Sequence, residues 1–160
     1  MKKHFIRLFI YNDWANKRYF DFLKNIPSSE IPERIQLLAS HVITAQKLWL
    51  TRILGNPDLS IHIWKPLPWQ TLEEMSAENT RSWINYLQNS DEQEFERILS
   101  YENFQKIHYE NFVSDIIMQC INHATYHRAQ YAILLRQANI TPPNTDFITF
   151  AREYKSERII

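Results

Sequence analysis

The sequence predicts an all-α protein, specifically a four-helix bundle with a short C-terminal helix. The first observation behind this prediction is that Gly55 is the only glycine in 160 residues, whereas average usage of about 7% would give roughly eleven. The second is that apolar residues recur at helical spacing in long segments that prolines separate. Tightly turned β-sandwiches and barrels need many special turns, which this composition disfavours.

The first two helices are expected in the N-terminal third of the chain. Apolar residues at helical spacing indicate a helix over residues 3–25, which Pro27 stops. A second helix is expected over residues 32–54. Pro32 suits its first position, and Gly55 suits the left-handed residue just past its end.

A proline- and tryptophan-rich connection, residues 56–69, separates the second helix from the third. Thr71 and Glu74 form a T-x-x-E pattern, which is typical of a capping box at a helix N-terminus. The third helix is therefore expected to begin at this pattern and to run to about Gln88.

The helical period weakens over residues 94–109, and β-branched and aromatic residues around Glu102 and Asn103 indicate a small hairpin. A fourth long helix is expected over residues 113–138. A short C-terminal helix follows Asn144. The lengths of the four long helices match well enough for side-by-side packing in a bundle.

Charge and composition exclude several classes of function. Lys plus Arg and Asp plus Glu both number 18, so the chain has no basic field of the kind that drives nucleic-acid binding. One glycine excludes glycine-rich phosphate loops, and one cysteine excludes disulfides within the chain. No apolar stretch is long enough for a membrane span. We expect one domain over residues 1–160, in the cytoplasm, with neither nucleic acid nor membrane as a partner.

Three histidines fall on or beside the apolar faces of the predicted helices. His123 and His127 lie four residues apart in the fourth helix, so their side chains face the same way. His41 lies against the apolar face of the second helix. Bundles commonly build metal sites from inward side chains on facing helices. The competing interpretation is that each histidine is a hydrogen-bonded core residue.

Three histidine ligands would leave coordination positions open to water or substrate, the pattern of a catalytic metal site. Imidazole suits Zn, Ni, Fe or Cu. The segment between His123 and His127 lacks the glutamate of the H-E-x-x-H motif, so a zinc protease of that class is not supported. Cys120, one turn before His123, is either a fourth ligand or, by preference, a small core residue.

Three further polar residues are candidates for lining a ligand cavity. Asn12 and Asn16 lie four apart on the inner face of the first helix, where they could contact a ligand or a substrate. Arg128 follows His127 directly and could meet a carboxylate. The alternative for the two asparagines is capping or hydrogen bonding between helices, and the alternative for Arg128 is a solvated or structural role. No residue is singled out as catalytic.

Three segments of the chain resemble one known family when they are taken together and in order. They are YNDWANKRYFDFL near the start, HVITAQKLWLTRILG in the second helix, and INHATYHRAQYAILLRQANITPPNTDFITFARE in the last third. Over essentially its whole length the chain resembles the DinB/YfiT-like family of bacterial four-helix-bundle metalloproteins. The H-x-x-x-H-R helix and the Pro-Pro turn that follows it are the most specific features.

The resemblance implies a divalent metal, with zinc or nickel preferred, held by His41, His123 and His127. It also implies an up-down-down-up bundle and a homodimer. Related members include thiol S-transferases that use low-molecular-weight thiols, and damage-inducible proteins of the stress response. The leading hypothesis is a metal-dependent transferase or hydrolase in which the ion activates a thiol or water on a small-molecule substrate. The alternative is a non-catalytic, stress-associated metal-binding or structural protein.

Overall fold

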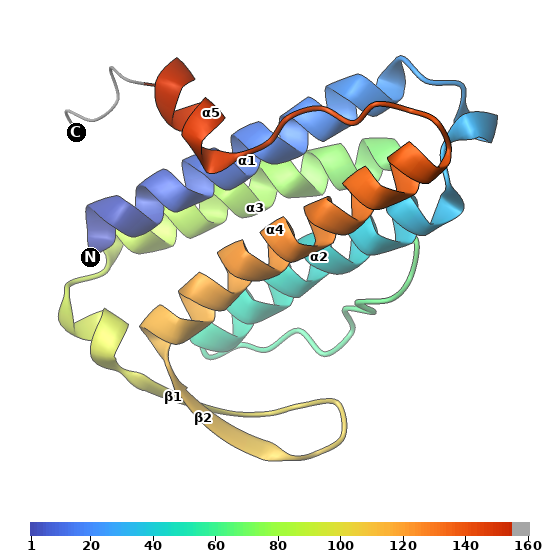
Figure 1. The fold of residues 1–160 in the computed structure, drawn as a ribbon. Coiled ribbons are helices and arrows are strands. Elements are labelled where there is room, and N and C mark those ends of the chain that lie inside the picture. The colour runs from blue at the N-terminus through green and yellow to red at the C-terminus, as the bar shows by residue number, and fades with distance from the viewer. Residues whose placement is uncertain (155–160) are drawn as a thin grey trace.

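A computed structural model of the chain describes residues 1–154. Its helices confirm the predicted all-α class (Figure 1). A 3₁₀ turn, η1 (Ser28–Glu30), follows the first helix. Among the described residues, no helix is both long and apolar enough to cross a membrane. The α-helices are α1 (Lys2–Lys24), α2 (Glu33–Ile53), α3 (Trp69–Asn89), α4 (Val113–Gln137) and α5 (Phe147–Glu153).

The four long helices form an up-down-down-up bundle, as the family resemblance implies. In Figure 1, α1 and α4 run in one direction and α2 and α3 in the other. Helix α1 packs against α3, and α2 packs against α4. Because α2 and α3 are parallel, residues 54–68 travel back along the length of the bundle before α3 begins. This crossover passes beside α2, where it reaches the candidate site described below.

The end of α2 confirms the prediction for the single glycine. Gly55 has a φ of 80°, and its N–H donates to the carbonyl of Arg52 at 3.0 Å. The N–H of Asn56 donates to the carbonyl of Thr51 at 2.9 Å. This pair of bonds is the Schellman arrangement, which requires a left-handed residue just past the helix. At the other end, Pro32 lies one residue outside α2 rather than at its first position.

The start of α3 differs from the prediction. The helix begins at Trp69, its N-cap residue is Pro68, and no side chain caps it. The capping box predicted from Thr71 and Glu74 is therefore wrong. An N-cap residue must have non-helical backbone angles, and here Pro68, with a ψ of 147°, has them while Thr71 already lies inside the helix.

The weakly helical segment before α4 is a hairpin, as predicted. After a short 3₁₀ turn, η2 (Gln93–Glu96), strand β1 (Ile98–Glu102) pairs antiparallel with β2 (His108–Phe112). The register opposes Ile98 to Phe112 and Glu102 to His108.

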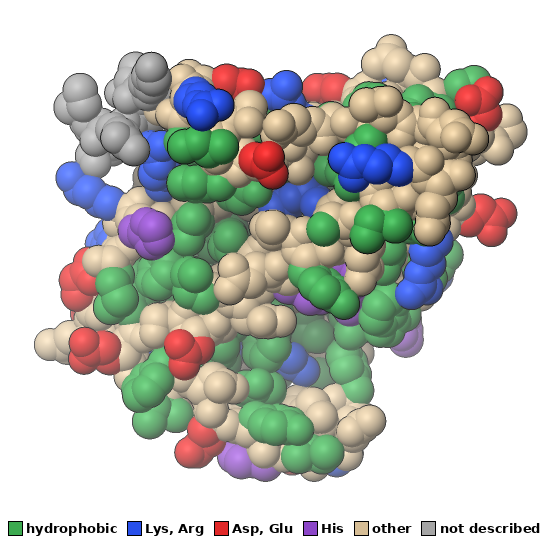
Figure 2. Space-filling model, in the orientation of Figure 1, with side chains coloured by type: hydrophobic (Ala, Val, Ile, Leu, Met, Phe, Trp, Pro, Cys, Tyr) green, Lys and Arg blue, Asp and Glu red, His purple; other side chains and the backbone are tan. Residues whose placement is uncertain are grey.

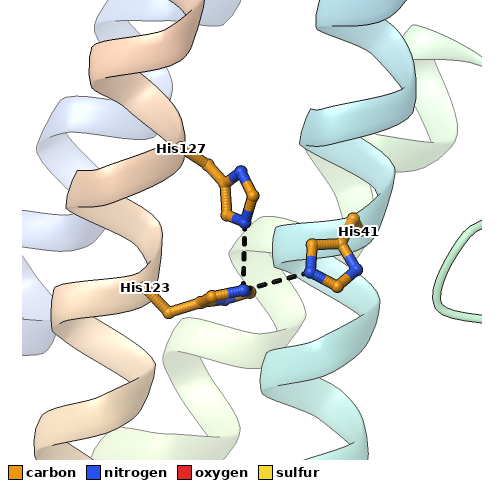
Figure 3. Close-up of side chains that lie close together, drawn as sticks. All are labelled: His41, His123 and His127. Carbon is orange, nitrogen blue, oxygen red and sulfur yellow. Dashed lines mark hydrogen bonds between the residues drawn. The ribbon is translucent and has the colours of Figure 1, made fainter.

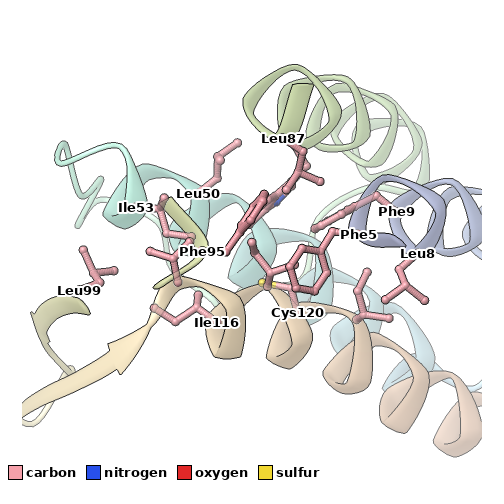
Figure 4. Close-up of a cluster of buried hydrophobic side chains, with 14 residues drawn as sticks. Phe5, Leu8, Phe9, Leu50, Ile53, Leu87, Phe95, Leu99, Ile116 and Cys120 are labelled. Carbon is pink, nitrogen blue, oxygen red and sulfur yellow. The ribbon is translucent and has the colours of Figure 1, made fainter. Parts of the chain in front are cut away.

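Apolar clusters fill the bundle at both ends, and a smaller one attaches α5 to α1. The cluster nearest the hairpin joins all four long helices (Figure 4). Within it, the rings of Phe9 and Trp83 stack at a centroid distance of 4.7 Å, and Trp83 is fully buried. Cys120 lies in this cluster and is 2% exposed. Buried aromatic and aliphatic side chains such as these supply most of the stability of a helical bundle.

Candidate metal centre

The three histidines predicted from the sequence meet at one point between α2 and α4 (Figure 3). The Nε2 atom of His123 lies 3.0 Å from Nε2 of His41 and 3.1 Å from Nε2 of His127. All three ligand nitrogens lie within 4.8 Å of one another. His41 and His127 are buried, and His123 is partly exposed.

Local structure explains how residues 82 positions apart come together. Helices α2 and α4 pack side by side, and His41 faces α4 from the middle of α2. His123 and His127 are one turn apart on the face of α4 that meets α2, as the i, i+4 spacing requires. The candidate site therefore rests on two rigid helices.

The outer nitrogens of two of the histidines are held by hydrogen bonds. His41 Nδ1 lies 3.0 Å from the backbone carbonyl oxygen of Ile63, in the crossover between α2 and α3. His127 Nδ1 lies 2.9 Å from the side-chain oxygen of Gln130. Oxygen in both groups accepts, so each Nδ1 carries the proton and donates. In a neutral imidazole the other nitrogen, Nε2, is then a bare acceptor.

Because of these hydrogen bonds, too few protons remain at the centre of the cluster to bridge the three Nε2 atoms. His41 and His127 both point unprotonated Nε2 atoms at His123 Nε2, which can carry at most one proton. At least one of the two close contacts between nitrogens is therefore unbridged by a proton. Lone pairs that converge at such distances call for a cation between them.

Burial keeps the cluster neutral rather than protonated. Desolvation, together with the neighbouring His127 and His41, lowers the pKa of His123 to about 4. Desolvation also lowers the pKa of His41 and of His127, while their hydrogen bonds to Ile63 and Gln130 act in the opposite direction. Near neutral pH all three rings are therefore in the form that binds metal ions.

The dimensions and chemistry of the cluster fit a divalent ion. Two nitrogen ligands that share a zinc ion at about 2.0–2.1 Å can lie no more than about 4.2 Å apart. The separations of 3.0 and 3.1 Å from His123 satisfy that limit, and because all three nitrogens lie within 4.8 Å of one another, a small shift of one imidazole lets the three share an ion. The hydrogen bonds to Ile63 and Gln130 are of the kind that fix the orientation of metal-binding imidazoles in proteins. The residues present therefore could hold a metal.

Aromatic side chains flank the cluster. The Trp64 ring stacks on His41 at a centroid distance of 3.7 Å and an interplanar angle of 8°. The Tyr126 ring lies 5.2 Å from the His127 ring. Both side chains are largely exposed. The Arg34 guanidinium lies over the Trp64 ring, 5.9 Å from its centre, and contributes positive charge near the site.

The remaining cysteine and histidines do not join the cluster. Cys120 is packed among apolar side chains, and burial raises the pKa of its thiol well above the usual range. It is the small core residue that the sequence favoured, since no described ligand group other than the three histidines completes the cluster. His4, His62 and His108 are exposed, as expected for surface or loop residues.

Asn12, Asn16 and Arg128 form a buried network of their own between α1 and α4. Arg128 Nη1 donates to Asn12 Oδ1 at 2.7 Å and to Asn16 Oδ1 at 3.0 Å. Asn16 also donates to Ser76 Oγ on α3 at 3.0 Å. The structure thus joins these three residues to one another, and their place in the lining of a metal cavity stays a prediction.

Sequence reasoning missed the residues that orient the histidines. Gln130 was visible as a hydrogen-bonding residue three positions after His127, on the same side of the helix. The Ile63 carbonyl left no signal, because every residue has one. Trp64 lies in a connection whose path depends on the parallel arrangement of α2 and α3, which the sequence alone does not specify.

Comparison with known proteins places the chain in a family. The model of the DinB family matches residues 1–158. Protein DinB of Bacillus subtilis (strain 168) is 26% identical over 168 residues, covering 95% of this chain and 96% of that protein. A crystal structure of a DinB-like protein from Bacillus cereus ATCC 10987 has the same fold, with a TM-score of 0.68 and 18% identity over 89% of this chain and 95% of that one. This chain belongs to the DinB family.

Proposed function

We propose that His41, His123 and His127 hold one divalent metal ion, with zinc or nickel preferred. The observation that carries this proposal is the convergence of their Nε2 atoms, two of which have their protons committed to the opposite side of the ring. Imidazole nitrogen is a good ligand for both metals.

We further propose that the protein is a metal-dependent transferase acting on a low-molecular-weight thiol, with a hydrolase as the variant in which water takes the place of the thiol. A divalent ion would lower the pKa of a thiol or water beside it and so make it nucleophilic at neutral pH. Three neutral ligands leave a net positive charge at the centre, and no described carboxylate joins them. Such a site favours an anionic partner such as a thiolate.

The chain's own residues would orient the reactants. The Ile63 carbonyl and the Gln130 side chain fix the direction in which the two buried imidazoles point. The partly exposed His123 leaves the centre open on one side. The exposed rings of Trp64 and Tyr126, beside His41 and His127, offer apolar surface to a small-molecule substrate.

The experiment is a conjugation assay with monochlorobimane as the electrophile and cysteine or glutathione as the thiol. We expect the protein loaded with zinc or nickel to accelerate loss of the thiol, and chelation or His123→Ala to abolish the acceleration. His108→Ala, which removes an exposed histidine of β2, is the matched control and should keep full activity. Metal binding without turnover of any thiol would favour the non-catalytic, stress-associated alternative.

The homodimer and the cytoplasmic location expected from the sequence remain predictions. Size-exclusion chromatography with light scattering tests for the homodimer, because a dimer has twice the mass of the 19.3 kDa chain. Fractionation of cells tests for the cytoplasmic location.

A further inference from the structure

Arg128 is the most deeply buried charge in the described part of the chain, and the proposed metal chemistry does not use it. The residue is 3% exposed and lies between α1 and α4. Its guanidinium contacts neutral groups: the side-chain oxygens of Asn12, Asn16 and Thr125, and the ring of Tyr11 at 5.5 Å. None of the ion pairs among residues 1–154 includes it.

The hydrogen bonds of Arg128 do not use all the donors of its guanidinium. Of its five N–H bonds, Nη1 uses two, on Asn12 and Asn16, and Nη2 uses one, on Thr125 Oγ1 at 3.1 Å. Nε is buried and has no partner. The remaining donors are thus Nε and one hydrogen of Nη2, and the Tyr11 hydroxyl lies near the same guanidinium. These two nitrogens form the edge that binds both oxygens of a carboxylate or phosphate.

A buried cation with an unpartnered donor is costly. Burial lowers the pKa of Arg128, but a guanidinium keeps its proton in proteins, so the charge remains. A buried donor without a partner costs about 1–3 kcal/mol, and a buried charge without a counter-charge costs more. An anion paired with the guanidinium would offset the missing counter-charge.

A cleft of about 680 Å³ adjoins Arg128 on the side away from α2. It lies between α1, α4 and the segment that leads from α4 to α5. Figure 2 faces this side of the molecule, and basic side chains are visible in and beside the recess. The walls include Leu8 and Ile121 together with Pro142 and Pro143. This volume suits a metabolite-sized ligand.

The charges around the cleft favour an anion. Arg136, an exposed residue two turns further along α4, lines the cleft together with Arg128. Asp146 is the one acidic residue in the lining, and it is exposed at the start of α5. Two guanidinium groups therefore face one carboxylate, and the deeper of the two has no ionic partner.

We propose that this cleft binds a small organic anion, whose carboxylate or phosphate pairs with the guanidinium group of Arg128. The short apolar body of the ligand lies against the walls of the cleft. The site is separate from the metal centre, because consecutive helix residues point about 100° apart. His127 faces α2, whereas Arg128 faces α1.

The experiment follows the Arg128 Nε–H signal by NMR while hexanoate or hexyl phosphate is added to the whole protein. We expect at least one of the two anions to shift this signal. The dependence of the shift on anion concentration should give a Kd below about 1 mM. Hexanamide, which has the same body without the charge, should leave the signal in place. The response to the two anions separates a carboxylate ligand from a phosphate ligand. Use of the His123→Ala protein excludes binding at the metal centre, so this proposal and the proposed function fail independently.

Two variants test the location. Ala132→Phe adds bulk inside the cleft and keeps Arg128, so it should weaken binding at least roughly tenfold. Ala77→Phe adds the same bulk at a half-buried position on α3, outside the cleft, and should bind as the unmodified protein does. Absence of any shift up to about 10 mM anion, an equal shift with hexanamide, or unchanged binding by Ala132→Phe would overturn the proposal.

Discussion

Two neighbouring residues of α4, His127 and Arg128, belong to buried polar clusters with opposite needs. The histidine cluster has acceptors that face one another without enough protons. The arginine cluster has a fixed positive charge and a donor with no acceptor. The comparison shows that burial of polar groups in a bundle does not by itself define their role. The surplus of lone pairs calls for a cation in one cluster, and the surplus of donors calls for an anion in the other.

The arginine cluster also joins helices, and Arg128→Met tests that contribution. The substitution leaves the Asn12 and Asn16 oxygens without the donor that holds them to α4. This cost outweighs the relief of removing a buried charge, so we expect a net loss of about 2 kcal/mol in the free energy of unfolding. Urea denaturation measures it. The control is Arg136→Met, at an exposed site on the same helix, which should change stability by no more than about 0.5 kcal/mol. A similarly small effect of Arg128→Met would contradict a joining role.

In the histidine cluster, Gln130→Leu tests whether an outer hydrogen bond orients a ligand. Without the Gln130 oxygen, the His127 ring loses the partner that keeps its Nε2 unprotonated and aimed at the centre. We expect roughly tenfold weaker metal binding, measured by competition with a chromogenic chelator. Gln137→Leu, at the exposed end of α4, serves as the control. Equal affinities of the two variants would show that Gln130 does not support the site.

We also expect the histidine cluster, but not the arginine cluster, to make the stability of the fold depend on pH. Because His123 has a pKa of about 4 in the folded chain, against 6.5 as its ordinary value, the unfolded chain binds the proton first as the pH falls. The metal-free protein should therefore keep the full contribution of neutral His123 above about pH 6.5 and lose it progressively towards pH 4. Since His123 is partly open to solvent, we expect a loss on the order of 1 kcal/mol.

Urea midpoints at several pH values measure this loss, and His123→Ala isolates it. Carboxylates whose pKa is lowered, such as Glu94, also destabilise the fold in acid, but they contribute equally to both proteins. The difference between the unmodified protein and His123→Ala should thus narrow or reverse as the pH falls from 6.5 to 4. A difference that does not change with pH would contradict the low pKa.

The smallest effect is expected at a position that touches neither cluster. Gly55→Ala puts a side chain at a φ of 80° with nothing within 4 Å of the added carbon. The cost is therefore backbone strain alone, about 1 kcal/mol. Thermal or urea denaturation checks the stability. Metal content should be unchanged, and a loss of metal would show that the crossover after α2 depends on this helix end.

The sequence allowed prediction of the elements with strong periodic or stop signals. The four long helices, the hairpin and the role of Gly55 follow from apolar spacing and from turn chemistry. The start of α3 did not, because the T-x-x-E pattern favoured Thr71 as the N-cap, whereas the helix begins at Trp69, after Pro68, which has no capping side chain. The residue at which a helix begins depends on the path of the chain that leads into it, and tertiary packing decides that path.

The candidate metal centre was predictable only in part, for a similar reason. His123 and His127 were linked by their spacing on one helix, and His41 was linked to them by its place on the apolar face of the second helix and by the resemblance. The contacts that aim them came from the fold: the Ile63 carbonyl reaches His41 only because the crossover returns beside α2. The cleft beside Arg128 was not predictable either, because the segment after α4 has no regular period that would fix its path.

The most direct test of the metal centre is elemental analysis of untagged protein purified without chelators. We expect about one divalent ion per chain in the unmodified protein and in His108→Ala, and almost none in His123→Ala, because three convergent nitrogens bind far more tightly than two. Near-zero metal in the unmodified protein after incubation with zinc or nickel would contradict the proposed centre. Equal metal content in the unmodified protein and in His123→Ala would do the same.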